Sequence, residues 1–263
     1  MPYASTGDGK VYYESHGEGP ALVLLHGGGG NHAAWYQQIP HFKQRYRVIT
    51  IDLPGFGLSL IDSGRFDTGL HPAAIEAVLD HAGVDRVFMV SQSLGGYSML
   101  SYAVHHPERV AGIVMTSTLG PVGDEISDLN DKGREQVRHL SVADFLLTKE
   151  FQEKEVEKVH LFFQVGSFNQ TGPGRPNRLA NSLKGSVSIQ QMRDAITAGV
   201  SISILEGGAD VMVYKPAYAR LRELLPEANV QLVEGAPHSD YWENPQRFNS
   251  VVDEILDRAY QAG

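Results

Sequence analysis

The chain has 263 residues, of which 42% are hydrophobic and 20% charged, a composition typical of a folded globular protein. Its formal net charge of −9 disfavours nucleic acid as a partner, and the lack of cysteine excludes disulfides, thiolate catalysis and cysteine metal sites. The N-terminus lacks the features of a secretory signal, and no apolar stretch reaches the roughly 20 residues of a membrane span, so we expect a cytoplasmic protein without a membrane partner.

Short apolar runs alternate with helical patterns through the first part of the chain. The expected elements are a hairpin of 3–6 and 10–15, strands 21–25 and 47–51, helix 71–82, strand 86–90, helix 94–106 and strand 111–115. The run 21–25 is continuously apolar, which is typical of a strand covered on both faces. This alternation predicts an α/β fold with a doubly wound, mostly parallel sheet.

The stretch 120–198 is polar and lacks strand-like runs. Its expected helices are 126–140, 142–147, 151–163 and 189–198. Strand patterns return at 201–205 and 230–233, with a helix over 216–225 between them and an amphipathic terminal helix over 245–260. We therefore expect a helical cap, residues 120–198, inserted into a core formed by residues 1–119 and 199–263.

The segment Val90–Gly96 reads V-S-Q-S-L-G-G and lies between an expected strand and an expected helix. A sharp turn at this junction strains its central residue, Ser93, and requires small neighbours such as Ser91 and Gly95. The turn also presents a hydroxyl at the positive end of a helix, where a nucleophile is useful. The pattern therefore indicates Ser93 as a candidate nucleophile.

Four further motifs follow expected strands. They are H-G-G-G-G at 26–30, D-L-P-G-F-G-L-S at 52–59, G-G-A-D at 207–210 and G-A-P-H at 235–238. In this order, together with the segment around Ser93, they resemble the α/β-hydrolase superfamily over nearly the whole chain. One departure is Ser91, which stands where the family's G-x-S-x-G elbow has its first glycine.

The resemblance implies a catalytic triad in the chain order Ser93, Asp210, His238. His238 would serve as the base that activates the hydroxyl, and Asp210 would orient the imidazole. Asp52 and Asp124 are the alternatives for the acid. The carboxyl ends of parallel strands would hold all three members, as is usual in open α/β sheets.

Acyl transfer also needs donors for the oxyanion that develops on the substrate. The expected donors are the amides of Leu94 and Gly28, with Gly29 as the alternative to Gly28. A phosphate-binding role for the glycines lacks the accompanying Lys-Ser/Thr pair. We also expect four residues at the substrate pocket, namely Gly29, His32, Gln92 and Trp242. No cofactor and no metal are expected.

The expected function is a serine hydrolase that forms an acyl-enzyme with a small to medium carboxylic ester, thioester or lactone. Trp242, four residues after His238, keeps a C–C bond hydrolase of ring-cleavage products open as an alternative. A ligand-sensing member of the fold, a haloperoxidase-like enzyme and a menaquinone-pathway lyase share the same framework. The expected partner is a small-molecule substrate, and the oligomeric state is not predicted.

Overall fold

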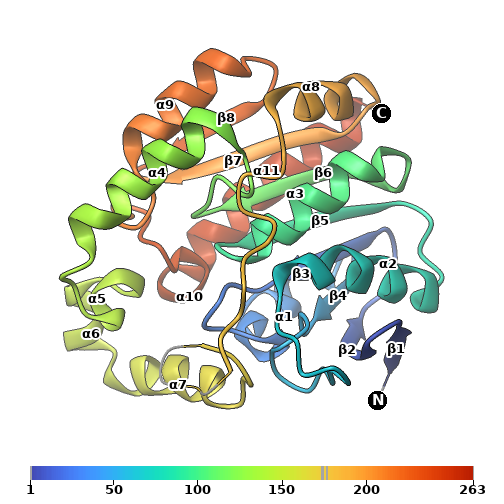
Figure 1. Ribbon diagram of the computed structural model, residues 1–263, viewed down its shortest axis with the longest axis horizontal. Helices are drawn as coiled ribbons and strands as arrows, with labels where there is room; N and C mark the ends of the chain where they lie inside the picture. The colour runs from blue at the N-terminus through green and yellow to red at the C-terminus, as the bar shows by residue number, and fades with distance from the viewer. Residues whose placement is uncertain (1, 173–174, 176, 263) are drawn as a thin grey trace.

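One eight-stranded sheet with helices around it makes up residues 2–172, 175 and 177–262, the part of the chain that the computed structural model describes (Figure 1). The strands are β1 (Tyr3–Thr6), β2 (Gly9–His16), β3 (Ala21–Leu25), β4 (Arg47–Ile51), β5 (Val87–Gln92), β6 (Val110–Thr116), β7 (Ser201–Gly207) and β8 (Asn229–Val233). The helices are α1 (Ile39–Phe42), α2 (His71–Ala82), α3 (Gly95–His105), α4 (Asp124–Val137), α5 (Val142–Leu146), α6 (Lys149–Lys154), α7 (Val156–Ser167), α8 (Ile189–Thr197), α9 (Lys215–Leu224), α10 (Asp240–Glu243) and α11 (Pro245–Ala262), with short 3-10 turns η1 (His32–Trp35), η2 (Thr68–Leu70) and η3 (Pro107–Arg109).

The strands follow the order β1-β2-β4-β3-β5-β6-β7-β8. The two pairs that include β2 are antiparallel, and every pair from β4 to β8 is parallel. The strand order reverses at β3, which lies between β4 and β5. Open α/β sheets bind ligands outside the carboxyl ends of the strands near such a reversal. The predicted doubly wound, mostly parallel sheet is confirmed.

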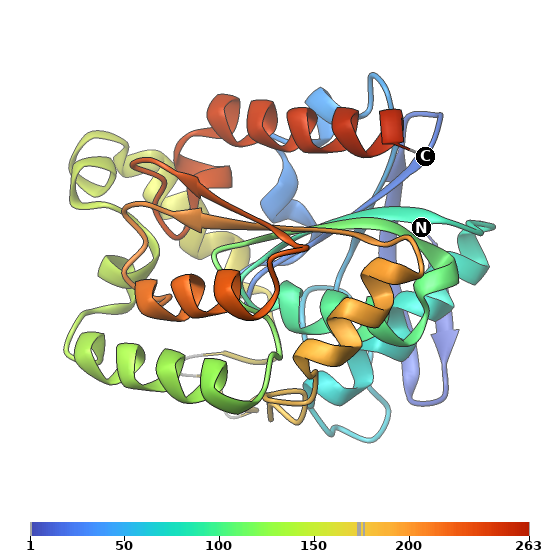
Figure 2. The same cartoon turned by 90° about the horizontal axis from the view of Figure 1, so that it is seen from above.

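Alternate residues of the central strands face two separate hydrophobic cores. In β3, Val23 and Leu25 pack in the core that includes residues of α2, α3, α8 and α9. Leu22 and Leu24 pack in the other core, with residues of α1 and α11. Figure 2 shows these two groups of helices on opposite faces of the sheet. Burial on both faces explains why the strand is apolar at every position.

The helices between β6 and β7 differ from the prediction at one place. A single helix was expected over 151–163, and the structure has two, α6 and α7, separated by Glu155 with φ −120° and ψ 50°. The Thr148 side chain caps α6 by accepting a hydrogen bond from the Phe151 N–H. Phe151 and Phe162 both pack in the core that includes α11. The residues at the break, 152–156, include no glycine or proline, so the sequence did not mark the end of a helix there.

The helices of residues 120–198, the predicted cap, lie at two different places in the fold. Helices α5, α6 and α7 lie beyond the carboxyl ends of the strands, whereas α4 packs on α9 and α8 packs on α3 (Figure 1). Within the described residues no strand of the sheet comes from this stretch, but isolated bridges join Asp67 to Ala180 and Val122 to Val187. None of the described helices combines the length and apolar character needed to cross a bilayer.

Candidate active site

Ser93 occupies the turn between β5 and α3 in a strained conformation. Its φ of 48° lies in the left-handed region, where residues other than glycine are uncommon. The Ser93 N–H donates to the Thr116 carbonyl oxygen at 2.9 Å, which fixes the turn against the end of β6. The turn and its backbone strain, expected from the sequence, are present in the structure.

The neighbours of Ser93 are small because backbone and side chains crowd the turn. A Cβ at Gly95 would lie 2.5 Å from the Leu25 carbonyl oxygen, and one at Gly96 would lie 2.4 Å from the Thr118 methyl group. Ser91 is fully buried, and its Oγ has no hydrogen-bond partner among the described residues. Serine therefore fits at position 91 as a small residue.

The structure brings Asp210 and His238 into direct contact. Asp210 follows β7, His238 lies in the loop between β8 and α10, and both side chains are buried. His238 Nδ1 lies 3.0 Å from Asp210 Oδ2, and the Met212 N–H donates to the other carboxylate oxygen at 2.8 Å. Two segments 28 residues apart thus form one hydrogen-bonded pair.

The Asp210 carboxyl is held in its ionised form. Burial is the largest influence and raises its pKa, but the His238 imidazole, the Met212 amide and Lys215 outweigh it and leave the pKa below the ordinary value. A carboxylate facing Nδ1 favours the tautomer with the proton on Nδ1, so Nε2 is the free acceptor. His238 Nε2 is buried and has no hydrogen-bond partner among the described residues.

Gln92, predicted at the substrate pocket, is attached to the His238 loop instead. Its Nε2 donates to the His238 carbonyl oxygen at 3.1 Å. Its Oε1 would lie 1.9 Å from a Cβ at Gly27, so any side chain at position 27 would displace it. Gln92 therefore joins the turn at Ser93 to the backbone of His238 and packs against the glycine loop, residues 27–30.

The glycine loop follows β3 and has a fixed peptide orientation at its start. The Gly27 carbonyl oxygen accepts from His26 Nδ1 at 2.8 Å and from the Gly30 N–H at 3.0 Å. A trans peptide directs its N–H away from its carbonyl, so the Gly28 N–H points away from these partners. Neither the Gly28 nor the Leu94 amide has a hydrogen-bond partner among the described residues.

Ser93 and His238 line one cavity of about 490 Å³, together with Gly28 and Gly29. Apolar side chains supply most of its wall, namely Val142, Phe145 and Leu146 of α5, Phe162 and Phe163 of α7, and Met212. The remaining lining residues are Gly166, Ser167, Asn169, Thr171, Gly172 and Arg175. No motif had pointed to Asn169 or Met212, because a lone polar or apolar residue in a loop carries no periodic signal.

His32 and Trp242, the other residues predicted at the substrate pocket, are not among the described residues that line this cavity. His32 Nδ1 bonds Asp52 Oδ1 at 2.8 Å, and Asp52 also accepts from the Leu58 N–H at 2.8 Å. The Trp242 indole is buried, and its Nε1 donates to the Lys158 carbonyl oxygen at 3.2 Å, beneath α7. Asp52 is thus bonded to His32, not to His238, and the side chain of Asp124 lies outside the described part.

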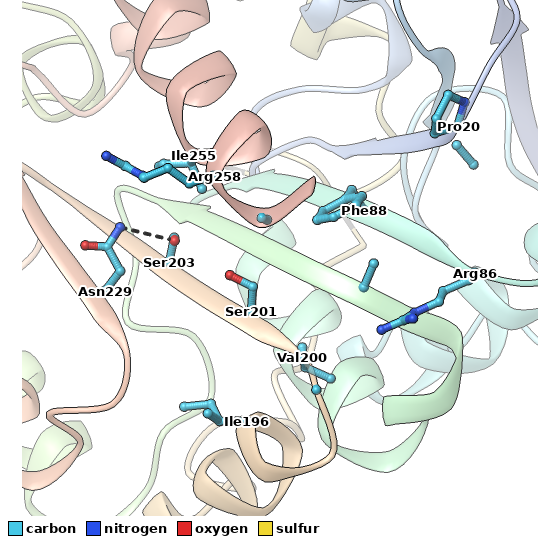
Figure 3. Close-up of a pocket in the computed structure, with 14 residues that line it drawn as sticks. Pro20, Arg86, Phe88, Ile196, Val200, Ser201, Ser203, Asn229, Ile255 and Arg258 are labelled. Carbon is cyan, nitrogen blue, oxygen red and sulfur yellow. Dashed lines mark hydrogen bonds between the residues drawn. The ribbon is translucent and has the colours of Figure 1, made fainter. Parts of the chain in front are cut away.

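A second cavity, of about 900 Å³, lies at the opposite edge of the sheet (Figure 3). Its walls come from the first residues of several strands and from α11, including Ser201, Asn229 and Arg258. Asn229 Nδ2 donates to Ser203 Oγ at 3.3 Å there. Neither Ser93 nor His238 reaches it, so the larger cavity is not where the candidate nucleophile and base meet. The described residues contain no group of His, Asp and Glu arranged to hold a metal ion.

Comparisons with known proteins agree with this architecture. The family model described as alpha/beta hydrolase fold matches residues 20–245. A 2-hydroxy-6-oxo-6-phenylhexa-2,4-dienoate hydrolase of Burkholderia cepacia is 31% identical over 94% of this chain and 91% of that protein. A pimeloyl-(acyl-carrier protein) methyl ester esterase of Aeromonas hydrophila subsp. hydrophila is 28% identical over 94% of this chain and 99% of that protein.

The solved structure of a thermophilic esterase from Thermogutta terrifontis has the same fold. It superposes with a TM-score of 0.76 over 98% of both chains, at 19% sequence identity. The matching family model covers most of the chain, and the curated relatives are named esterases and hydrolases. The chain therefore belongs to the α/β hydrolase fold family and is a hydrolase.

Proposed function

We propose that the protein hydrolyses carboxylic esters through an acyl-enzyme formed on Ser93. The observation that carries this proposal is the placement of Ser93 and His238 on one cavity, with Nδ1 of His238 bonded to Asp210. A hydroxyl, an imidazole with a free buried nitrogen and an ionised carboxylate are the parts of a serine-hydrolase triad.

In the proposed reaction, Ser93 Oγ attacks the ester carbonyl carbon while His238 Nε2 takes the hydroxyl proton. His238 then gives this proton to the leaving alcohol, and Asp210 stabilises the imidazolium between the two transfers. A water molecule, deprotonated by the same imidazole, attacks the acyl-enzyme; the acyl–oxygen bond breaks, His238 returns the proton to Ser93 Oγ, and the carboxylic acid is released. Thioesters and lactones react at the same kind of carbonyl carbon.

The amides of Leu94 and Gly28 are the proposed oxyanion donors. Both lack a hydrogen-bond partner among the described residues, Leu94 follows the nucleophile directly, and Gly28 lines the cavity. Removal of one such donor from a serine hydrolase costs about 3–4 kcal/mol of transition-state stabilisation. A site with both amides in place would therefore account for a large share of the rate enhancement.

The apolar wall supplied by α5 and α7 supports a substrate with an apolar acyl or alcohol group. A cavity of about 490 Å³ accommodates a small to medium molecule. We propose that α5, α6 and α7 form the substrate-covering part of the predicted cap, since α4 and α8 pack on helices of the core. The identity of the substrate would then depend mainly on these three helices.

C–C bond hydrolysis is the second candidate, supported by the likeness to the Burkholderia cepacia dienoate hydrolase over 94% of this chain. Trp242 adds little to this candidate, because its buried indole supports α7. Parallel assays with a p-nitrophenyl ester and with 2-hydroxy-6-oxo-6-phenylhexa-2,4-dienoate separate the two reactions. Faster turnover of the dienoate would replace ester hydrolysis as the conclusion.

Covalent labelling tests the assignment of Ser93 independently of the substrate. A fluorophosphonate should add one phosphonyl group to the folded protein, and peptide mapping should locate it on Ser93. Ser93→Ala should remain unlabelled, whereas Ser91→Gly, which restores the family's elbow glycine, should be labelled. Labelling of Ser93→Ala at the wild-type rate would refute the nucleophile assignment.

A further inference from the structure

Asn169 is a buried amide that connects three segments beside the nucleophile. It follows α7, is 4% exposed and lines the cavity that contains Ser93. Its Nδ2 donates to the Gly30 carbonyl oxygen at 3.0 Å, and its Oδ1 accepts from the Gly57 N–H at 3.0 Å. One side chain thus joins the end of α7 to the glycine loop and to the loop after β4.

The two backbone partners fix which way the amide points. A carbonyl oxygen only accepts and a backbone N–H only donates, so the Gly30 and Gly57 contacts assign the nitrogen and oxygen of Asn169 without ambiguity. An aspartate has the same shape, but it would place a carboxylate oxygen against the Gly30 carbonyl. The position therefore depends on the amide and not on size alone.

A second buried amide, Asn31, strengthens the same connection. Its Nδ2 donates to the Val165 carbonyl oxygen at 2.8 Å and to Asn169 Oδ1 at 3.3 Å. The backbone of α7 also approaches the glycine loop closely, because a Cβ at Gly166 would lie 2.6 Å from the Gly29 carbonyl oxygen. The far end of the glycine loop is therefore held from the α7 side.

His26 holds the other end of the loop through the Gly27 carbonyl oxygen. The Gly28 N–H belongs to the same peptide group as that carbonyl oxygen, which also accepts from the Gly30 N–H at 3.0 Å, so the position of Gly30 helps to orient it. A short glycine segment has many accessible backbone conformations, so the direction of its N–H depends on what holds its two ends. Asn169 supplies the attachment at Gly30.

We propose that Asn169 is a positioning residue that holds the glycine loop so that the Gly28 amide faces the oxyanion. This inference rests on the proposed ester hydrolysis, since it concerns the donor that the reaction uses. Asn169 acts through the loop, and its effect therefore belongs to the transition state more than to substrate binding.

The test compares Asn169→Asp with Gln170→Leu in hydrolysis of the p-nitrophenyl ester that the wild type prefers. Gln170 is a matched control, because its Nε2 donates to the Ser59 carbonyl oxygen at 2.7 Å and, among the described residues, its side chain makes no hydrogen bond to the glycine loop. Asn169→Asp should lower kcat by about 10- to 100-fold, less than complete loss of an oxyanion donor, with KM changed less than about threefold. Gln170→Leu should retain kcat within about twofold of the wild type.

A trifluoromethyl ketone gives a second measurement, because it forms a tetrahedral adduct that carries the oxyanion. Its inhibition constant should weaken in Asn169→Asp by the same factor as kcat. Asn169→Ser, which introduces no charge, should show the same pattern if Asn169→Asp does not fold. Unchanged kcat in a folded Asn169 variant, or a loss confined to KM, would overturn the inference. Wild-type protein without ester turnover would instead refute the proposed function.

Discussion

Ser93 shows how one strained residue constrains its surroundings. A non-glycine residue in the left-handed region costs on the order of 1–3 kcal/mol, which the rest of the fold must offset. The hydrogen bond to Thr116 and the close packing of Gly95 against β3 fix the turn. These requirements explain why the sequence pattern around Ser93 could be recognised, since it follows directly from backbone sterics.

The negative charge of the Asp210 side chain should matter for catalysis far more than the size of that side chain. Asp210→Asn keeps the size but removes the charge that favours the Nδ1–H tautomer, so kcat should fall by about 10³- to 10⁴-fold. Stopped-flow or steady-state hydrolysis of a p-nitrophenyl ester measures this directly. Asp240→Asn is the control, because this buried carboxylate bonds Arg247 and not His238. Equal losses in both variants would argue against the assigned pair.

Side chains whose hydrogen bonds reach distant segments were harder to predict than the residues of the sequence motifs. Gln92 was expected at the pocket, yet its side-chain amide donates to the His238 carbonyl oxygen. Asn169 carries no motif at all, and its role depends on contacts with Gly30 and Gly57, more than 100 positions away. Long-range hydrogen bonds of single side chains leave no periodic trace in a sequence.

At the scale of elements, the half-buried His32 of η1 bonds the buried Asp52 in the loop after β4. Burial is the largest influence on His32 and lowers its pKa, but the hydrogen bond and charge of Asp52, with the charge of Glu14, leave the pKa above the ordinary value. His32 also packs against the Tyr12 ring. The pair therefore links the first residues after the glycine loop to the neighbouring strands.

The raised pKa of His32 makes its contribution to stability depend on pH. The charged form is favoured in the folded state, so the contribution is complete below the unfolded pKa of about 6.5 and is lost as pH rises through the higher folded pKa. Replacement by glutamine should therefore destabilise the protein more at pH 6 than at pH 9. Urea unfolding at the two pH values measures the difference.

The exposed His160 of α7 supplies the control for this experiment. The effect of His160→Gln on the free energy of unfolding should differ less between pH 6 and pH 9 than the effect of His32→Gln. A His32→Gln effect that is constant with pH, or larger at pH 9, would contradict the role given to the Asp52 pair.

The boundaries of helices and strands in the core follow the local pattern of apolar residues, whereas the boundary between α6 and α7, near the cavity, does not. Strands such as β3 and helices such as α2 are covered by the core and show the expected apolar sequences. The break at Glu155 between α6 and α7 falls in a stretch without glycine or proline, and residues of both helices pack in the same core. Tertiary packing decided this boundary, and the sequence carried no local signal for it.

At the scale of the whole molecule, His71 at the start of α2 connects the loop after β4 to α3. His71 is fully buried; its Nε2–H donates to the Pro54 carbonyl oxygen at 3.2 Å, and Ser98 Oγ lies 2.8 Å from its Nδ1. Burial, the largest influence, lowers the pKa of His71 to about 3. The folded protein therefore holds this histidine neutral at acidic pH.

Acid should destabilise the molecule through this histidine. Below about pH 6.5, His71 binds a proton in the unfolded chain but not in the folded chain. The stabilisation of the folded state by neutral His71 is therefore complete above that pH, and the free energy of unfolding falls as pH decreases toward 3. His71 should contribute about 1.4 kcal/mol per pH unit between pH 6 and pH 4. Urea unfolding of the wild type and of His71→Gln over this range should give a shallower pH dependence for the variant. Equal slopes would contradict the assignment.

The order of motifs along the chain predicted most of the molecule's architecture. The motifs that contain His26, Asp52, Ser93, Asp210 and His238 follow strands β3, β4, β5, β7 and β8, and parallel strands bring their carboxyl ends to one edge of the sheet. The cavity itself was less predictable. Its apolar wall combines α5 with α7 and Met212, and only the three-dimensional arrangement shows that these residues face Ser93.

The central claim is that Ser93 is the nucleophile of an ester hydrolase. The most direct measurement is steady-state hydrolysis of p-nitrophenyl esters from acetate to octanoate by the wild type and by Ser93→Ala. Wild-type turnover should peak at one acyl length that fits the cavity of about 490 Å³. Folded Ser93→Ala should lose about 10⁴- to 10⁶-fold in kcat at every length. Wild-type-like turnover in the folded variant would contradict the assignment of Ser93 and the mechanism built on it.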